Sequence, residues 1–375
     1  MNVRDQINYH KQFPVMQGPP GAETQFDGER YLYFGGTGYY CLQNNSQVIS
    51  AALEALNKHG THCATSRAGY GNIPIVQELE LEAAKYFATD DALYLATGFL
   101  SDAAGLQALC HYKQVDVIFV DEFSHYSNRD GIATTNKPVL IFRNRDNLHL
   151  EELLQKNLQP KQKPLVVTDG IFSIAGVVSP IPKHLALMEQ YDGNIWVDDA
   201  HGLGILGPNG RGSFDHHRLS SPRLFHGGTL AKAFGGFGGI IPGSFDFIEC
   251  LRQGTTVNSG SYFAPAVAAS LAGIRWVDQN PHLKDKLRSN ALYLKSKLRR
   301  IGLTVENNDL PIVSWTVGDA TIMSNIQKAL FKQKIAIQYC HYIGTGEHGV
   351  LRAVVFSTHT KEQINFFVEH LKSLL

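Results

Sequence analysis

The sequence has no excess of charge of either sign. Its 34 Lys and Arg residues equal its 34 Asp and Glu residues, so the formal net charge at pH 7 is zero. Proteins that bind nucleic acid or an anionic membrane surface usually carry a basic patch, and this balance offers none. We therefore expect neither nucleic acid nor a membrane among its partners.

Paired cysteines and long apolar runs are also missing. The five cysteines are scattered and form no Cys-x-x-Cys pair, which argues against a disulfide framework or a zinc ribbon and favours a reducing compartment. No run approaches the ~20 apolar residues of a membrane-spanning helix. The polar start Met1–Gln6 lacks the apolar core of a signal peptide. We expect a cytoplasmic protein.

The length of the chain predicts more than one domain. At 375 residues it exceeds the roughly 250–300 residues at which single cores stop growing, and 43% of its residues are hydrophobic. We find no internal repeat. The predicted division is an N-terminal segment (1–45), a large domain (46–265) and a small C-terminal domain (266–375).

From about residue 47, amphipathic helices alternate with short apolar strands. Gln47–His59 and Ile75–Ala88 have the apolar spacing of helices. Six compact apolar runs predict strands: Ala92–Ala96, Val115–Asp121, Pro138–Phe142, Pro164–Thr168, Asn194–Asp198 and Leu224–Thr229. Apolar strands separated by helices indicate an α/β fold, with a mostly parallel sheet covered on both faces. Such sheets place their chemistry beyond the carboxyl ends of the strands.

After Pro265 the pattern becomes that of a smaller α+β unit. Its predicted helices are Ala264–Gln279, Leu283–Arg300, Ala320–Gln333 and Thr360–Leu374. Its predicted strands are Leu303–Glu306, Pro311–Val317, Ile335–Tyr339 and Val350–Phe356. The first ~35 residues are rich in Gly, Pro and Gln, and we expect them to wrap over another part of the molecule.

One lysine, Lys232, follows a predicted strand and stands among small residues. Its run is Thr229-Leu-Ala-Lys-Ala-Phe-Gly-Gly-Phe-Gly-Gly239, with a hydroxyl three positions before the lysine and glycines after it. A Schiff-base lysine needs a nucleophilic amine at a strand end, room for a planar ligand and a nearby phosphate anchor. An exposed lysine in a glycine-rich turn is the alternative interpretation.

The predicted strand 194–198 delivers an acid, Asp198, and a histidine, His201, to its carboxyl end. An aspartate beside a pyridine nitrogen keeps that nitrogen protonated, which makes the ring the electron sink of pyridoxal phosphate (PLP) chemistry. A helix-capping aspartate with a hydrogen-bonded histidine is one alternative. A metal site is another, although its candidate ligands have no recognisable spacing: Asp198, Asp199, His201, His216 and His217.

Two further segments suit anions. The small residues of 96–102, which include Gly98, Phe99 and Leu100, leave backbone N–H groups where a helix begins near Ser101, a suitable place for a phosphate. Arg352 lies in an apolar strand, and its planar guanidinium suits a substrate carboxylate. An ordinary strand–helix turn and an internal salt bridge are the alternatives.

Two single residues and one glycine motif complete the candidates. His125 could stack on a planar ring and Ser173 could contact a ring substituent, or they could be a surface histidine and a loop serine. The run Gly202-Leu-Gly-Ile-Leu-Gly207 matches the dinucleotide fingerprint. Because the turn-rich Pro208–Gly212 stands where that fingerprint requires a helix, we reject a dehydrogenase or nucleotide-binding module.

In this order and spacing, the segments resemble the α-oxoamine synthases, which use PLP to condense an amino acid with an acyl-CoA on the aspartate-aminotransferase fold (fold type I). The resemblance runs from about Tyr31 to the carboxyl terminus. Its motifs include Val-Asp-Asp-Ala-His-Gly, Gly-Gly-Thr-Leu-Ala-Lys-Ala-Phe-Gly-Gly and Phe-Ala-Pro-Ala-Val-Ala-Ala-Ser. They look closest to the 2-amino-3-ketobutyrate CoA ligase and 8-amino-7-oxononanoate synthase branches.

The resemblance implies a role for each candidate. Lys232 would form the Schiff base and serve as the catalytic acid and base, Asp198 would meet the pyridine nitrogen, and His125 would stack on the ring. The remaining contacts would be His201 and Ser173 with the ring hydroxyl, Thr229 and the 98–100 amides of Gly98, Phe99 and Leu100 with the phosphate, and Arg352 with the amino acid carboxylate. The family's active site lies between two subunits, so we expect a homodimer in which the turn 259–261, with Ser261, reaches the partner's phosphate.

Three departures from the family pattern leave the cofactor residues intact. Thr37 stands where an asparagine helps to bind the substrate carboxylate, Val76 replaces a histidine, and Ala175 replaces an aspartate. They bear on the choice of amino acid and acyl-CoA. We predict a PLP-dependent acyltransferase that joins a small amino acid to an acyl-CoA, releasing CoA and CO₂. An aminotransferase, a decarboxylase or a C–C lyase on the same fold is the alternative.

Overall fold

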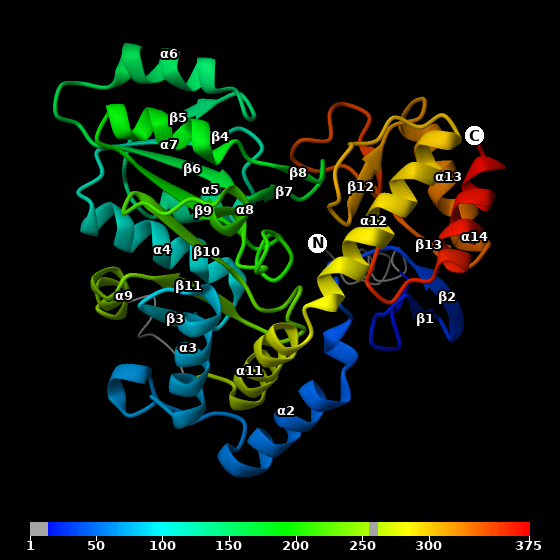
Figure 1. The fold of residues 1–375 in the computed structure, drawn as a ribbon, viewed down its shortest axis with the longest axis horizontal. Helices are drawn as coiled ribbons and strands as arrows, with labels where there is room; N and C mark the ends of the chain where they lie inside the picture. The colour runs from blue at the N-terminus through cyan, green and yellow to red at the C-terminus, as the bar shows by residue number, and fades with distance from the viewer. Residues whose placement is uncertain (1–13, 255–261) are drawn as a thin grey trace, which may run out of the picture.

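The computed structural model describes residues 14–254 and 262–375, which form two lobes (Figure 1). The larger lobe surrounds a seven-stranded sheet, and the smaller lobe holds two three-stranded sheets. The chain passes from the first lobe to the second through two long consecutive helices, α11 (Ala264–Gln279) and α12 (His282–Arg300).

The seven-stranded sheet has the order β3-β11-β10-β9-β6-β4-β5. Six of its strands are parallel, whereas β11 runs antiparallel to β10 and β3. The strand bounds are β3 Asp91–Leu95, β4 Val117–Asp121, β5 Val139–Phe142, β6 Pro164–Asp169, β9 Asn194–Asp198, β10 Leu224–Thr229 and β11 Gly239–Gly243. The mostly parallel α/β sheet expected from the sequence is confirmed.

Helices cover both faces of this sheet because its central strands are apolar on both sides. In β9, Ile195 and Val197 pack with residues of α6 and α7, while Trp196 between them packs with residues of α4 and α9. The helices of this lobe are α2 Ser46–His59, α3 Pro74–Phe87, α4 Gly98–Tyr112, α5 Tyr126–Ala133, α6 Asn147–Asn157, α7 Ile181–Gln190, α8 Ser213–His217 and α9 Phe245–Arg252. Two short strands, β7 (Ile171–Phe172) and β8 (Val177–Val178), form a separate hairpin.

The small lobe combines chain from both ends of the sequence. One sheet has the order β12-β15-β14, and the other has the order β1-β2-β13. The bounds are β1 Glu23–Phe26, β2 Glu29–Tyr33, β12 Ile312–Trp315, α13 Ala320–Lys332, β13 Ile335–Ala336, β14 Gln338–Cys340, β15 Val350–Val354 and α14 Lys361–Lys372. Residues 23–33 thus wrap over the C-terminal part, as the composition of the N-terminal segment predicted.

Two predictions for the small lobe were wrong. Residues 303–306 form no strand, although Leu303 and Val305 pack against the core of the small lobe, because the segment pairs with none of its strands. The predicted strand Ile335–Tyr339 is two short strands in different sheets, since β13 pairs with β2 and β14 pairs with β15. The hairpin β1–β2 and the antiparallel β11 were not predicted.

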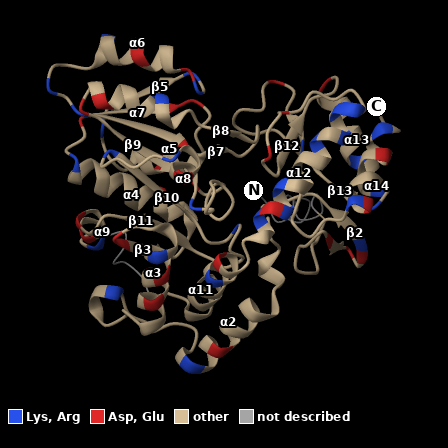
Figure 2. Ribbon diagram, in the orientation of Figure 1, with Lys and Arg blue, Asp and Glu red and all other residues tan. Residues whose placement is uncertain are grey.

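The fold determines where the charged side chains lie and where the ends of the strands meet. In Figure 2, both α3 and α14 carry side chains of both signs. Within the described residues, no helix is long and apolar enough to cross a membrane. The strands β3, β4, β6, β9 and β10 end side by side, so the residues that end or follow them meet at one edge of the sheet: Thr97, Asp121, Asp169, Asp198 and Thr229.

Candidate active site

Lys232 lies three residues beyond the end of β10, in a tight turn. The turn is closed by hydrogen bonds from Leu230 N to Gly238 O (2.9 Å) and from Gly236 N to Leu230 O (3.0 Å). No described residue forms a hydrogen bond or ion pair with the Lys232 amine. Burial lowers the pKa of Lys232 to about 8, although the carboxylates of Asp198 and neighbouring residues oppose this shift. An amine with this pKa is a competent nucleophile near neutral pH.

Asp198, the last residue of β9, is buried at the same edge of the sheet. Its Oδ1 accepts a hydrogen bond from Ala200 N (2.9 Å), and its Oδ2 lies 3.5 Å from the Ser127 hydroxyl, which donates to it. Asp198 contributes to the pKa shifts of both Lys232 and His125, so its carboxylate lies within electrostatic range of both. It caps no helix of the described residues, which removes that alternative.

His125 caps the N-terminus of α5, and its backbone is hydrogen-bonded to a buried aspartate. Its backbone N–H donates to Asp169 Oδ1 (3.0 Å), and its ring Nδ1 accepts from Ser127 N (3.2 Å). The ring lies 6.2 Å from that of Tyr342, centroid to centroid. Burial lowers the pKa of His125, with Lys232 adding to this effect and Asp198 opposing it. His125 is therefore one wall of the site.

His201 lies three residues beyond Asp198. Its ring Nδ1 is 2.7 Å from the hydroxyl of Tyr39, a fully buried residue of the N-terminal part. Burial lowers the pKa of His201 well below its usual value, and the positive charges of Lys232, Arg352 and His125 lower it further. Residues from three other segments therefore lie within electrostatic range of His201.

Arg352 reaches this point from β15 of the small lobe. Its Nε donates to Ser173 O (2.9 Å) and its Nη1 donates to Gln338 Oε1 (2.7 Å). It forms no ion pair with any carboxylate of the described residues, although it is buried. With Thr37, Ser173, Gln338 and His201 it lines a cavity of about 310 Å³. The internal salt bridge is therefore contradicted, and a buried guanidinium faces a cavity.

A second group of predicted residues meets where α4 begins. A Cβ atom placed on Gly98 would lie 2.6 Å from Thr229 Cβ, so only glycine allows this close approach. The amides of Gly98 and Phe99 have no acceptor among the described residues. Leu100 N differs, because it donates to Thr97 Oγ1 (3.3 Å) and to Thr97 O (3.2 Å). Ser261 lies outside the described residues.

The residues of the metal alternative are separated. Asp199 accepts from the backbone N (2.6 Å) and the hydroxyl (2.7 Å) of Ser213 and faces His226, and His217 Nε2 bonds the carbonyl of Ser179. No group of three His, Cys, Asp or Glu side chains in the described part of the chain could hold a metal ion.

The structure shows where the glycine run 202–207 and two of the departures from the family pattern, Val76 and Ala175, lie. Residues 201–210 form successive turns, and the next helix, α8, begins only at Ser213, so this run lacks the dinucleotide-binding geometry. Val76 is fully buried in the core. Ala175 lies in the turn between β7 and β8.

Several residues at this site were missed from the sequence. Tyr39, Asp169, Gln338 and Tyr342 all touch predicted site residues, yet each comes from a segment remote in sequence from its partner. Asp169 alone had a usable signal, because it ends an apolar strand as Asp198 does. Burial raises the pKa of Asp169 well above its usual value, and the nearby Asp198 raises it further.

Comparison with known proteins identifies the family. The pattern of the family described as aminotransferase class I and II matches residues 36–371. The chain belongs to this family.

Members of this family with known names resemble the whole chain. An 8-amino-7-oxononanoate synthase of Alkaliphilus oremlandii is 32% identical over 99% of this chain and 94% of its own length. A serine palmitoyltransferase of Bacteroides thetaiotaomicron is 31% identical over 96% of this chain and 91% of its own length. Both names belong to the α-oxoamine synthases, so the expected resemblance is confirmed.

Solved structures of the aminotransferase class I and II family share this fold. The serine palmitoyltransferase of Sphingomonas wittichii superposes with a TM-score of 0.91 at 23% identity, covering 99% of this chain and 95% of its own. A serine palmitoyltransferase determined with PLP bound gives the same score at 24% identity, with the same coverage of both chains. These likenesses confirm fold type I.

The residues present fit PLP, the cofactor of this group. The amine of Lys232 has no partner among the described residues, a carboxylate stands at the end of β9, and the glycine at the start of α4 leaves free amides beside Thr229. An aldehyde, a pyridine nitrogen and a phosphate require these three kinds of group. The set therefore matches the cofactor at each of its reactive or charged points.

Proposed function

We propose that this protein is an acyltransferase that condenses a small amino acid with an acyl-CoA, releasing CoA and CO₂ to give an amino ketone. The observation that carries the proposal is that Asp198, His201 and Arg352 all lie within electrostatic range of Lys232 beyond the carboxyl edge of the sheet. The relatives named 8-amino-7-oxononanoate synthase and serine palmitoyltransferase support it. They do not favour the aminotransferase, decarboxylase or lyase alternative.

Each side chain has a distinct task in this proposal. When bound, PLP withdraws electrons from the substrate Cα. Asp198 keeps the pyridine nitrogen protonated by its opposite charge. Lys232 would hold the cofactor covalently, and its free amine would accept the proton from the Cα of the amino acid. His125 supports the face of the ring, while His201 and Ser173 contact its hydroxyl group.

The ends of the substrate and cofactor are held by charge and backbone. Arg352 binds the amino acid carboxylate, since its guanidinium is buried without a carboxylate partner in the described chain. The amides of Gly98 and Phe99 hold the phosphate. Leu100 N, which donates to Thr97, and the Thr229 hydroxyl, which donates to Gly238 O (2.9 Å), join them if they leave these partners. The Cα then bonds to the thioester carbon, the C–S bond breaks, and CoA leaves as its thiol with the proton that Lys232 accepted. The carboxylate leaves as CO₂, and a proton takes its place on the Cα.

We also propose a cytoplasmic homodimer with an active site shared between subunits, in which Ser261 serves the partner's phosphate. The homodimer is supported by large apolar side chains that are exposed near the site. They include Phe99 (47% exposed) at the start of α4 and Phe237 (54%) in the turn 230–238 that carries Lys232, here called the lysine turn. Apolar surface of this kind marks protein interfaces. We further propose that the domain boundaries lie at residues 45 and 265. We also propose that Thr37 contacts the substrate.

The test compares two buried lysines. Lys232→Ala should abolish the visible absorption of bound PLP, whereas Lys295→Ala should retain it, although burial also lowers the pKa of Lys295 to about 8. Wild-type protein should then release CoA, detected by its free thiol, when an amino acid and an acyl-CoA are supplied together. Amino-group transfer to a keto acid without CoA release would overturn the acyltransferase proposal, and equal PLP loss in both variants would overturn the role of Lys232.

A further inference from the structure

Tyr39 is a buried residue whose contact with His201 no sequence motif predicted. It follows β2 in the chain, is fully buried, and places its hydroxyl 2.7 Å from Nδ1 of His201, 162 residues away. The two rings meet edge to face, 6.4 Å apart between centroids. A contact this short to a fully buried phenol fixes both rings.

The direction of this hydrogen bond follows from counting partners. Within the described residues, no other group accepts a hydrogen bond from the Tyr39 hydroxyl. A buried O–H group that donates to nothing costs about 1–3 kcal/mol, so the phenol must donate to Nδ1. Burial raises the pKa of Tyr39 well above its usual value and lowers that of His201, so both groups are neutral at pH 7. A neutral imidazole that accepts at Nδ1 carries its proton on Nε2.

We propose that Tyr39 is a positioning residue, which donates to Nδ1 of His201 and thereby keeps the ring proton on Nε2 as a donor for an oxygen of the bound cofactor. This inference rests on the proposed function, which places His201 beside the ring hydroxyl of PLP. No described residue accepts from Nε2 of His201, so its proton is available. Without the phenol, the ring could adopt either tautomer or rotate.

The backbone of Tyr39 is held from the small lobe. Its carbonyl accepts a hydrogen bond from Ser357 N (2.9 Å), in the turn that follows β15. Two residues on, the Cys41 thiol lies 3.2 Å from the Thr358 hydroxyl. The strand β15, which carries Arg352, therefore leads directly into the turn that holds Tyr39. The same segment of the small lobe supports both Arg352 and the tyrosine that bonds His201.

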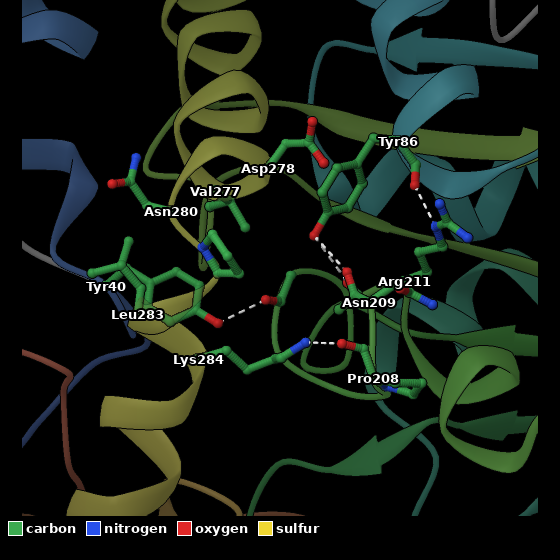
Figure 3. Close-up of a pocket in the computed structure, with 13 residues that line it drawn as sticks. Tyr40, Tyr86, Pro208, Asn209, Arg211, Val277, Asp278, Asn280, Leu283 and Lys284 are labelled. Atoms are coloured by element: carbon green, nitrogen blue, oxygen red, sulfur yellow. Dashed lines mark hydrogen bonds between the residues drawn. The ribbon is translucent and has the colours of Figure 1, made fainter.

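The neighbouring Tyr40 provides a matched control. It is also buried, and its hydroxyl donates over the same 2.7 Å, but to the carbonyl of Gly204. Figure 3 shows this contact beside the bond from Lys284 to the Pro208 carbonyl, in a cavity of about 190 Å³ whose lining includes neither His201 nor Lys232. Tyr40→Phe thus removes an equally short buried bond without changing the partner of His201.

The first measurement needs no cofactor. In apoprotein with ¹⁵N-labelled histidine, the His201 ring signals, assigned by their loss in His201→Asn, should show the Nε2–H tautomer. Tyr39→Phe should shift these signals toward a mixture of tautomers, and Tyr40→Phe should leave them unchanged. A Nδ1–H tautomer in the wild-type apoprotein would overturn the inference, and this result would stand even if the protein failed to bind PLP and the proposed function fell.

The second measurement uses PLP titrated into the same apoproteins. Tyr39→Phe should weaken PLP binding about tenfold, since it leaves a buried nitrogen unpaired, while Tyr40→Phe should change it less than about twofold. In the His201→Asn background, Tyr39→Phe should have almost no further effect, because coupled residues are not additive. Equal losses in the two tyrosine variants, or an undiminished effect in the His201→Asn background, would show a merely structural role. Melting temperatures of all apoproteins separate folding losses from binding losses.

Discussion

At the scale of single residues, the site depends on opposing effects on one amine. Burial lowers the pKa of Lys232 and the charge of Arg352 lowers it further, while Asp198, Asp169 and Asp102 raise it. Burial dominates, because the desolvation of an ammonium group outweighs carboxylates that are themselves hydrogen-bonded or neutralised. Burial also raises the pKa of Asp102 and of Asp169, so these two acids contribute less negative charge than their number suggests.

The pKa of Lys232 predicts how fast the apoprotein captures PLP. A protonated amine is not nucleophilic, so the capture rate should rise about tenfold per pH unit below pH 8 and level off above about pH 8. A lysine with the ordinary pKa of 10.5 would keep gaining rate up to that pH. Stopped-flow absorbance after mixing apoprotein with PLP measures the profile, and Lys295→Ala should reproduce it. A rate that continues to climb past pH 9 would contradict the lowered pKa.

At the scale of elements, the helix α11 supports the lysine turn through close contact with its backbone. A Cβ atom on Gly273 would lie 1.9 Å from Phe234 O, and the Ser270 hydroxyl lies 2.9 Å from Phe237 N and accepts from it. The turn that carries Lys232 therefore cannot move toward α11, and α11 cannot tolerate a side chain at position 273. The helix acts as a template for the position of the amine.

Gly273→Ala should therefore displace the lysine turn. We expect it to cost about 1–3 kcal/mol of folding stability, as overpacking usually does, and to reduce PLP occupancy as well. Ala272→Gly, at the adjoining and partly buried position, should lower stability by about 1 kcal/mol through helix propensity and leave PLP occupancy unchanged. Chemical denaturation and the visible spectrum measure the two effects. Full PLP occupancy in Gly273→Ala would show that α11 does not position the turn.

The same elements show what a sequence can predict. Asn194–Asp198, Leu224–Thr229 and Ala264–Gln279 have the same bounds in prediction and structure, because each is a continuous apolar or amphipathic run between clear breakers. The strand Gly239–Gly243 was missed, since glycines and Pro242 argue against a central strand. In the structure only Gly239 and Ile240 pair with β10, so Pro242 lies where β3 is the single neighbour.

The residues of the candidate site likewise fall into those that the sequence predicted and those that it did not. Lys232, Asp198 and Arg352 each stand in or after a strand with a chemical reason that is local, and the structure brings them together. Tyr39 carries no local signal, because its contact depends on how the N-terminal part packs against the large lobe. Gln338 carries none either, because its contact depends on the pairing of β14 with β15. Periodicity within a segment contains no information about such packing.

At the scale of the whole molecule, the two lobes are joined by polar contacts at the site. Arg352 of β15 donates to Ser173 O, and Asn308 Nδ2 donates to Gly176 O (2.8 Å), so both contacts fall on the β7–β8 hairpin. Asn308 in turn accepts a hydrogen bond from the fully buried Lys295 of α12. The hairpin therefore fixes the distance between the small lobe and the carboxyl edge of the large sheet, where the cavity lies.

The proposed homodimer makes a prediction about mass that single substitutions can test. Phe263, which caps the start of α11, is 53% exposed, whereas Leu148 of α6 is 73% exposed, on a helix at the outer end of the large lobe (Figure 1). Sedimentation equilibrium should give twice the chain mass of 41.5 kDa for wild-type protein and for Leu148→Asp. Phe263→Asp should shift the population toward single chains, because a buried unpaired carboxylate at an interface costs several kcal/mol.

The dimer and the cofactor should then be linked. If the partner subunit completes the phosphate site, the Phe263→Asp protein should bind PLP more weakly as it is diluted, whereas Leu148→Asp should bind PLP equally well at every concentration. PLP titrations at two protein concentrations, read by visible absorbance, separate these outcomes. A wild-type protein that sediments at the mass of one chain while binding PLP fully would show that a single subunit builds the whole site. In that case the exposed phenylalanines near Lys232 would need another explanation.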